Sequence, residues 1–168
     1  RFHFPPTRRS GHRIMQLEKI SKSYGDIKVY QELDFEVAQG DKAVLAGENG
    51  AGKSTLLKIL AGVVEIDSGA RIVGYNVDIG YFSQTRLDVL NPENTVLREA
   101  YSAAPGYMSE TDVRTILGAF LFTGDDSDKK VKVLSGGEKS RLILAKLLIN
   151  PPNFLLLDEP TTHLDVDA

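Results

Sequence analysis

The fold of this chain is decided by the stretch Gly47-Glu48-Asn49-Gly50-Ala51-Gly52-Lys53-Ser54. Two of its glycines are separated by four residues and are followed directly by lysine and serine. An apolar run at 42–46 precedes the stretch and an amphipathic run at 56–60 follows it, which predicts a strand, a loop and a helix in that order. Glycines let the backbone turn tightly around an anion, with its N–H groups and the helix N-terminus facing the charge. The sequence therefore predicts a phosphate-binding loop.

The residue types in this loop indicate a nucleotide. We expect Lys53 to reach the β- and γ-phosphates as a point charge, and the Ser54 hydroxyl to coordinate Mg²⁺. The expected cofactors are ATP and Mg²⁺. The predicted nucleotide-binding residues of the loop are Gly47, Glu48, Asn49, Gly50, Ala51, Gly52, Lys53, Ser54 and Thr55.

A second motif lies near the end of the chain, where the apolar run at 154–157 is followed by Asp158 and Glu159. Such a short continuous run predicts a strand buried on both faces of a parallel sheet. At its carboxyl end, Asp158 is suited to hold Mg²⁺, directly or through water, and Glu159 to orient or deprotonate an attacking water. The alternative is a surface turn in which both acids are merely solvated. The phosphate loop in the same chain argues against that alternative.

A third motif combines Ser135 with Glu138, three residues later, ahead of an apolar face on 142–149. This pattern predicts a capping box that begins a helix. Gly136 and Gly137 do not fit a plain capping box, because each glycine costs about 1 kcal/mol in a helix interior and somewhat less in a first turn. We interpret them as a place where another group approaches the backbone. Ser135, Gly136 and Gly137 are therefore predicted to form a second phosphate site at a helix N-terminus.

Taken in chain order, the motifs at 47–54, 135–138 and 154–159 resemble Walker A, signature and Walker B of ABC ATPase nucleotide-binding domains, over nearly the whole chain. The resemblance implies that the signature of one domain caps the γ-phosphate held by the loop of a second ABC ATPase domain, in a head-to-tail pair. By the same resemblance, Tyr24 would stack on adenine and Gln84 would be the Q-loop glutamine that senses Mg²⁺ and the γ-phosphate. Without these motifs, Tyr24 would be read as packing and Gln84 as a solvated strand end. The implied catalytic residues are Glu159, Gln84 and Lys53, and the implied metal ligands are Ser54, Gln84 and Asp158.

Residues 161–165 resemble the D-loop, which crosses the interface of such a pair. His163 falls within it and is not interpreted as a metal ligand or base, because the family places its switch histidine on a later strand. We expect neither His163 nor the other histidines, His3 and His12, to be that switch.

Composition narrows the class of protein. The 168 residues, 42% hydrophobic and 26% charged, suit one domain. No apolar stretch approaches the length of a membrane span, and the absence of cysteine excludes disulfides and cysteine-based zinc or redox sites. These features fit a cytoplasmic protein. Because the chain begins at Arg1 and stops just after the D-loop, we expect it to be a fragment, truncated after the D-loop.

The first 13 residues form a basic arm, with a charge of +4 and no acidic residue, whereas the rest of the chain sums to −7. One interpretation is a solvated interdomain linker braced by Pro5 and Pro6. The other is a segment that contacts RNA phosphates. The four basic residues are Arg1, Arg8, Arg9 and Arg13.

The predicted fold class is α/β: a P-loop NTPase with an ABC-type ATPase core, an antiparallel β subdomain and a helical subdomain at roughly 85–150. The arm at 1–13 is expected to be the end of a linker, and 14–168 the ATPase domain. Predicted strands lie at 15–20, 31–37, 42–46, 70–73, 77–82 and 154–158. Predicted helices lie at 53–61, 95–103, 110–120 and 136–149.

Several stretches resemble the ABC-F subfamily of soluble tandem ATPases that act on ribosomes. They include 4–6 with 9–11, 79–84, 116–126, 134–142 and 158–165. Glu138 is a residue that this subfamily often shows, whereas Thr162 stands where it usually has asparagine. The resemblance implies the second ATPase domain of such a protein, with the ribosome and its RNA as partners. The alternatives are the ATP-binding subunit of a transporter, partnered by a membrane permease, and a nucleotide-binding module without catalysis.

Overall fold

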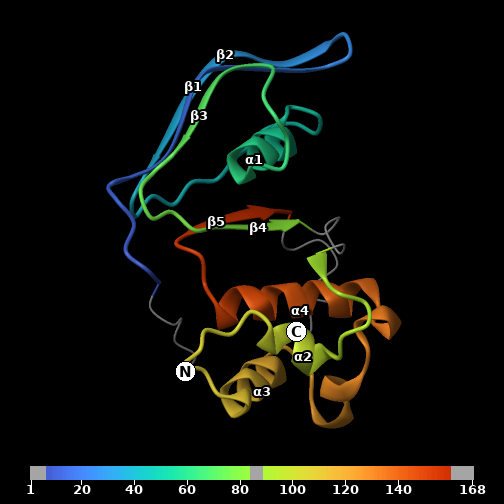
Figure 1. Cartoon of the computed structure of the whole chain (residues 1–168). Coiled ribbons are helices and arrows are strands. Elements are labelled where there is room, and N and C mark those ends of the chain that lie inside the picture. The colour runs from blue at the N-terminus through green and yellow to red at the C-terminus, as the bar shows by residue number, and fades with distance from the viewer. Residues whose placement is uncertain (1–6, 84–88, 160–168) are drawn as a thin grey trace. The chain divides into compact units, whose positions relative to one another are not determined.

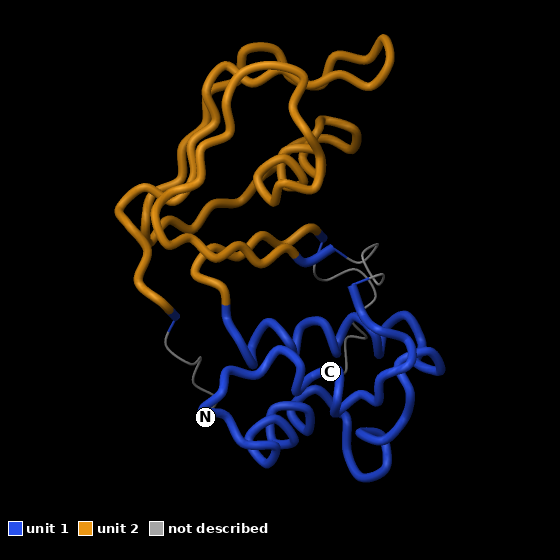
Figure 2. The backbone as a smooth tube through the Cα atoms, in the orientation of Figure 1, with its two compact units in different colours: residues 1–7, 82–151, 159–168 blue, residues 8–81, 152–158 orange. Residues whose placement is uncertain are grey.

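The structure is a computed structural model that describes residues 7–83 and 89–159. It divides into two compact units (Figure 2). Unit 2 comprises Arg8–Tyr81 and Pro152–Asp158, and unit 1 comprises Arg1–Thr7, Phe82–Pro151 and Glu159–Ala168. The predicted Q-loop residue Gln84, the D-loop at 161–165 and residues 1–6 of the arm lie outside the described residues.

Unit 2 contains a three-stranded antiparallel sheet with the order β2-β1-β3 (Figure 1). A tight turn at Gly25 and Asp26 joins β1 to β2, and the pairing of Tyr24 with Ile27 closes the hairpin. Gly25 has a φ of 57°, a conformation that glycine adopts without strain. This sheet confirms the predicted antiparallel β portion. Its strands are β1 (Arg13–Tyr24), β2 (Ile27–Ala38) and β3 (Ser68–Val73).

The helix α1 (Lys53–Ala61) packs in the same unit and begins at the residue that the sequence predicted. Its apolar residues Leu56, Ile59 and Leu60 are buried together with Ile14, Met15, Leu17 and Ile20 of β1. Gly62 ends the helix in the left-handed conformation, with its N–H bonded to the carbonyls of Ile59 and Lys58. This core holds the start of α1 in place beneath the phosphate-binding loop.

Two further strands, β4 (Ile79–Ser83) and β5 (Phe154–Asp158), pair in a separate two-stranded sheet (Figure 1). β5 has the predicted bounds. The prediction that both of its faces are buried is wrong, because Leu155 and Leu157 are 46% and 42% exposed while Leu156 is buried. Its side chains alternate as they do in a half-covered strand.

The predicted strand at 42–46 is also not present. These residues, which are described, join no sheet, and Val44 is 90% exposed. A strand is defined by hydrogen bonds to a neighbour, and no described strand pairs with this segment. An apolar run gives the tendency to form a strand, but the neighbouring strand has to be supplied by the fold.

Unit 1 is helical around one apolar core. It contains α2 (Val96–Tyr101), α3 (Glu110–Ala119), the 3₁₀ turns η2 (Gly124–Asp128) and η3 (Val131–Val133), and α4 (Gly136–Ile149). Val96, Val113, Leu117, Leu142 and Ile149 are fully buried in this core. The helix predicted at 136–149 has the predicted bounds, and the other two predicted helices are shorter by one to three residues.

A buried ion pair joins α4 to α2 within unit 1. The side chain of Glu99 on α2 is only 4% exposed, and it accepts hydrogen bonds from Lys146 on α4 and from the Asn94 amide, the latter at 2.7 Å. Burial tends to raise the pKa of Glu99, but these hydrogen bonds outweigh it and lower the pKa. The carboxylate is therefore charged within the core and matched by its lysine.

Candidate functional site

The predicted phosphate loop forms a tight turn directly before α1. Gly50 and Gly52 have φ values of 85° and 91°, both in the left-handed region that favours glycine. The Ala51 N–H donates to the Glu48 carbonyl at 3.2 Å, and the Leu56 N–H donates to the Gly52 carbonyl at 2.9 Å. Gly52 is therefore the N-cap of α1, and the loop leads into the positive end of that helix.

Gly52 is fixed in a second way, by its neighbours on β2. A Cβ at this position would lie 2.7 Å from Val29 Cγ1 and 2.9 Å from the Tyr30 hydroxyl oxygen. That hydroxyl donates a hydrogen bond to the Gly52 carbonyl at 3.0 Å, and burial raises the pKa of Tyr30. Only glycine combines this backbone conformation with this close approach, so β2 braces the loop.

Lys53 is held by the loop itself. Its Nζ donates to the carbonyl oxygens of Gly47 and Glu48, each at 2.7 Å. An ammonium has three donors, so these two bonds leave a third donor. The positive charge of Lys53 therefore lies against the backbone of the loop.

Ser54 and Asp158 meet although 104 residues separate them in the sequence. The Ser54 Oγ donates to Asp158 Oδ1 at 3.0 Å, and the Tyr81 hydroxyl donates to Asp158 Oδ2 at 3.1 Å. All three residues belong to unit 2. Each oxygen of the carboxylate thus has its own hydroxyl donor, which fixes the plane of the carboxylate beside the first turn of α1.

This donor set fits Mg²⁺ and a polyphosphate. Mg²⁺ prefers oxygen ligands and is held by one or two side chains together with substrate phosphates, rather than by a complete protein cage. Ser54 and Asp158 supply one hydroxyl and one carboxylate oxygen in contact. In the described ranges, no group of three or more histidine, cysteine, aspartate or glutamate side chains is placed to hold a metal by itself. The chemistry matches a metal that arrives with its nucleotide.

Tyr24 lies at the end of β1, 47% exposed, on the hairpin that also carries Tyr30. The Nζ of Lys22 lies 5.2 Å from the centre of the Tyr24 ring and 3.2 Å from Asp67 Oδ1. The hydrogen bond from Lys22 is the main cause that lowers the pKa of Asp67. Lys22 is therefore fixed between these two groups, and the exposed ring of Tyr24 has the character of a stacking surface.

Glu159 directly follows Asp158 and has a φ of 49°. This left-handed conformation is uncommon for a residue with a side chain, and such residues cluster at functional sites. Glu159 belongs to unit 1, as do Ser135, Gly136 and Gly137. The predicted site residues therefore fall into two groups, one in each unit.

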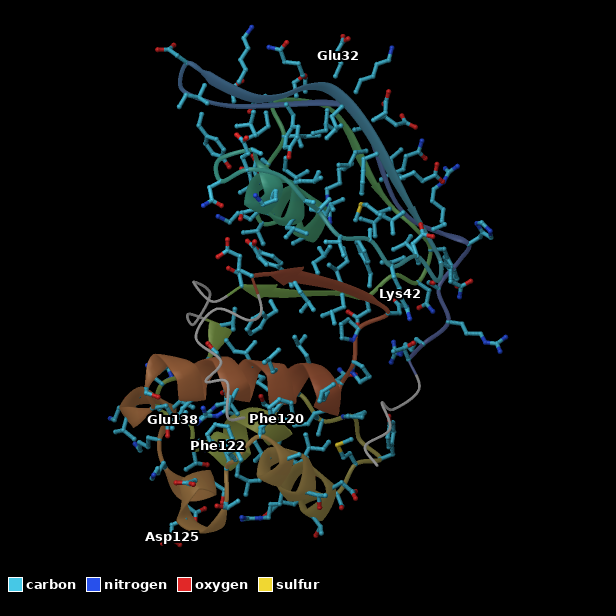
Figure 3. The ribbon with its side chains drawn as sticks, turned by 180° about the vertical axis from the view of Figure 1, so that it is seen from behind. Glu32, Lys42, Phe120, Phe122, Asp125 and Glu138 are labelled. Atoms are coloured by element: carbon cyan, nitrogen blue, oxygen red, sulfur yellow. The ribbon has the colours of Figure 1, made fainter. Side chains whose placement is uncertain are left out.

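The signature serine caps α4 as predicted. The Glu138 N–H donates to Ser135 Oγ at 3.2 Å, and the Ser135 N–H donates to Glu138 Oε2 at 2.7 Å. Glu138, labelled in Figure 3, has a lowered pKa, first because of the backbone hydrogen bond from Ser135 and second because of the Ser135 side chain. The capping box that the sequence predicted is confirmed.

The two glycines of this helix end face open space. A Cβ on Gly136 or on Gly137 would have no described atom within 4 Å beyond the neighbouring residues. Packing inside the described chain therefore does not require glycine at either position. This is the opposite of Gly52, and it leaves the backbone open to a group from outside.

Sequence reasoning missed the two tyrosine hydroxyls of the phosphate site, those of Tyr30 and Tyr81. Both lie on strands, and a strand pattern shows which face a side chain takes but not which distant group its hydroxyl meets. For Tyr81 one signal was available, because it stands close before Gln84 on the strand that pairs with β5.

These features define a P-loop nucleotide-binding protein. The ABC transporter family matches residues 30–162, so the chain belongs to that family. Among the relatives, YdiF of Bacillus subtilis is 45% identical over 99% of this chain. The ABC transporter F family member 5 of Arabidopsis thaliana is 37% identical over the whole chain, and the ATP-binding protein Uup of Escherichia coli is 38% identical over 95% of it. These relatives confirm the resemblance to the F subfamily.

The chain spans about a quarter of the length of these relatives, namely 26% of YdiF and of Uup and 24% of the Arabidopsis protein. Among solved structures, a bacterial Atm1-family ABC exporter with ATP bound matches with a TM-score of 0.74 and 23% identity, over 96% of this chain and 32% of that one. This likeness confirms the fold class. None of the helices in the described ranges is long and apolar enough to cross a membrane.

Proposed function

We propose that this chain binds and hydrolyses ATP as the ATPase domain of an ABC-F protein, and that the whole protein acts on ribosomes in the cytoplasm. The observation that carries the enzymatic part is the phosphate site of unit 2, where Lys53, Ser54 and Asp158 converge on the start of α1. The ribosomal part rests on the resemblance to the ABC-F subfamily, and the Arabidopsis relative is named as an F family member.

Lys53 provides the binding charge. Its two bonds to the Gly47 and Glu48 carbonyls are made within the loop, so the ammonium exchanges neutral acceptors for phosphate oxygens when ATP enters. Hydrogen bonds between charged partners are roughly twice as strong as neutral ones. The exchange therefore favours the anion, and the lysine needs no large movement.

Ser54 and Asp158 would hold Mg²⁺, which supplies charge neutralisation at the β- and γ-phosphate oxygens. Tyr81 keeps Asp158 Oδ2 in a hydrogen bond and so directs Oδ1 toward Ser54. Glu159, one residue further, orients the attacking water and accepts its proton. By the resemblance to ABC ATPases, Gln84 would act at the metal and Tyr24 at the adenine.

Ser135, Gly136 and Gly137 act on the nucleotide of a second domain. The hydroxyl oxygen of Ser135 accepts from the Glu138 N–H, and its hydrogen is available to a phosphate oxygen. The open space at both glycines admits a partner that carries that phosphate. ATP therefore favours the paired state and hydrolysis releases it.

ATP binding tests the phosphate site. Lys53→Ala should weaken the binding of a fluorescent ATP analogue about 10- to 100-fold, because it removes a charge-assisted contact worth about 1.5–3 kcal/mol. Lys58→Ala, on the same helix but outside the site, is the matched control and should bind as the parent does. Equal binding by Lys53→Ala and the parent would overturn the assignment.

Hydrolysis is tested with Glu159→Gln in the complete protein, because a composite site needs two domains. ATP should still bind, while turnover falls about 10²- to 10⁴-fold. Full turnover by this variant would exclude Glu159 as the base. Co-sedimentation of the complete protein with ribosomes tests the partner, and association with a membrane permease instead would favour the transporter alternative.

A further inference from the structure

Lys22 and Asp67 form an ion pair at the end of β1, directly before Tyr24. The Nζ of Lys22 lies 3.2 Å from Asp67 Oδ1 and 5.2 Å from the centre of the Tyr24 ring. The Lys22 side chain is only 14% exposed, whereas lysines are buried to this extent mainly when they are paired. The ammonium is thus held between a carboxylate and an aromatic ring.

Asp67 is bonded to the last residues of β1 through its backbone as well as through its carboxylate. The Ser23 N–H donates to Asp67 Oδ2 at 2.7 Å, and the Asp67 N–H donates to the Ser21 carbonyl at 2.9 Å. Together with the bond from Lys22, three consecutive residues of β1 are bonded to this one residue. Both carboxylate oxygens therefore order the segment that leads into Tyr24.

The charge of Lys22 is compensated, unlike that of Lys53. The Nζ of Lys53 donates to neutral carbonyl oxygens of the loop, so its charge is available to an anion. The Nζ of Lys22 donates to a carboxylate, so the pair as a whole is close to neutral. Because a neutral pair attracts a phosphate only weakly, Lys22 is suited to hold the ring of Tyr24 rather than to bind the phosphates.

The ammonium of Lys22 also determines how the Tyr24 ring is presented. A cation is attracted to the face of an aromatic ring, and it lies over the ring here. The ring is 47% exposed, so part of its surface remains accessible. A base that stacks on a ring already held in place loses less conformational entropy than one that must order the ring first.

The same hairpin connects this ring to the phosphate loop. Lys22 pairs with Tyr30 across β1 and β2, and the Tyr30 hydroxyl donates to the Gly52 carbonyl at 3.0 Å. Residues that pair directly across two antiparallel strands lie on the same face of the sheet. Backbone pairing therefore sets the separation between the ring and the loop, which a site for a base and its phosphates requires.

We infer that Lys22 and Asp67 are positioning residues for the base of the nucleotide, and that they act through the ring of Tyr24. The inference rests on the proposed function, which assigns ATP to this site and its adenine to Tyr24. It requires that the pair contributes to the affinity for a nucleotide but not to the affinity for a polyphosphate without a base. An ion pair that only stabilises the fold, or a lysine that attracts phosphate, would not make this distinction.

The test compares ATP with tripolyphosphate, both with Mg²⁺, by calorimetric titration of the chain. Lys22→Met keeps most of the stem and removes the charge, and it should weaken ATP binding about 2- to 10-fold, which corresponds to one aromatic pair. The affinity for tripolyphosphate should not change. Lys22→Arg keeps a cation for both partners and should bind ATP like the parent. Lys19→Met, at an exposed position on the same strand, is the matched control and should also bind like the parent.

A double-mutant cycle shows whether Lys22 acts through the ring. In a Tyr24→Ala background, Lys22→Met should cause no further loss of ATP affinity, because the group that it positions is gone. Independent contributions would instead multiply. If thermal unfolding shows that Lys22→Met is not folded, Asp67→Asn takes its place in the cycle, because its amide oxygen still accepts from the Ser23 N–H.

The inference is overturned if Lys22→Met binds ATP like the parent, if it loses ATP and tripolyphosphate affinity equally, or if its loss multiplies with that of Tyr24→Ala. The proposed function fails by a different result, namely that the parent does not bind ATP or that Lys53→Ala binds it equally well. A parent that binds ATP through Lys53 but not with the help of Lys22 would therefore overturn the inference alone.

Discussion

The two regions that we propose to bind phosphate, the loop at 47–54 and the start of α4, are built in opposite ways. In unit 2 the loop at 47–54 is already ordered by hydrogen bonds. Tyr30 donates to the Gly52 carbonyl, Lys53 donates to carbonyls of the loop, and Ser54 donates to Asp158. In unit 1 the start of α4 has a capping box, and among the described residues no atom beyond the chain neighbours lies within 4 Å of a Cβ placed on Gly136 or Gly137. The difference supports the proposal that the first region holds a ligand and that the second recognises one held by another domain.

The contrast has a physical reason. A ligand is bound tightly when its site is already ordered, because little conformational entropy is then lost on binding. A surface that closes on a ligand held by another domain must stay open until that domain arrives. Order in the first region and exposure in the second are the states expected of two halves of a composite site.

The largest effect is expected at the buried ion pair that fastens α4. Lys146→Met leaves the Glu99 carboxylate, 4% exposed, without its counter-charge, and should lower the free energy of unfolding by about 3 kcal/mol. Urea denaturation measures it. Lys132→Met is the control: it breaks the solvent-exposed pair with Glu93 and should change the free energy of unfolding far less than Lys146→Met does. A double variant, Lys146→Met with Glu99→Leu, should recover most of the loss.

Replacing Gly52 and Gly136 with alanine should have opposite effects on the free energy of unfolding. Gly52→Ala forces a left-handed φ on a side chain that meets Val29 and Tyr30, and should lower the free energy of unfolding by about 1–3 kcal/mol. Gly136→Ala meets no described atom and improves helix propensity, so it should be neutral or stabilising by up to about 1 kcal/mol. Thermal unfolding measures both. A loss at Gly136 comparable to that at Gly52 would contradict the contrast.

The hydroxyl of Tyr81 is expected to affect the affinity for Mg²⁺ rather than the stability of the fold. Tyr81→Phe removes the hydrogen bond to Asp158 Oδ2, worth about 1 kcal/mol, and should raise the Mg²⁺ concentration at half-saturation of ATP binding about fivefold. Affinity for ATP without Mg²⁺ should not change. Tyr101→Phe, on α2 in unit 1, is the control. An equal change with and without Mg²⁺ would show that the tyrosine acts on the loop as a whole.

The smallest effect is a pH dependence at the capping box. Because folding lowers the pKa of Glu138, its ionised form adds stability above the unfolded pKa of about 4.3, and the gain is lost as pH falls through the lower folded value. The difference in unfolding free energy between the parent and Glu138→Gln should be below about 1 kcal/mol at neutral pH. It should shrink in acid. Glu65→Gln, at an exposed position with no capping role, serves as the control.

Local signals in the sequence predicted the local structure well. The bounds of α1, α4 and β5 and the capping box of Ser135 and Glu138 follow from spacing within a few residues, and the structure has them as predicted. The sequence assigned Ser54 and Asp158 to Mg²⁺ separately. Their direct hydrogen bond at 3.0 Å was not predicted and was found only in the structure.

The predictions that were wrong concern features that depend on segments distant in the sequence. The run at 42–46 has a strand composition but no described strand beside it, and Leu155 and Leu157 are exposed because only one face of β5 is covered. The hydroxyl of Tyr30 gave no signal of its partner, and the position of Tyr81 close before Gln84 was the one signal for the other. A strand pattern gives the face on which a side chain lies but not the distant group that its hydroxyl meets.

The sequence by itself determined the family, the phosphate loop and both helix starts, because each depends on residue types at short fixed spacings. Only the tertiary structure decided that Tyr81 and Ser54 share the two oxygens of Asp158. This arrangement joins segments that are up to about a hundred residues apart. The packing of the whole core brings such segments together, and no local pattern contains that information.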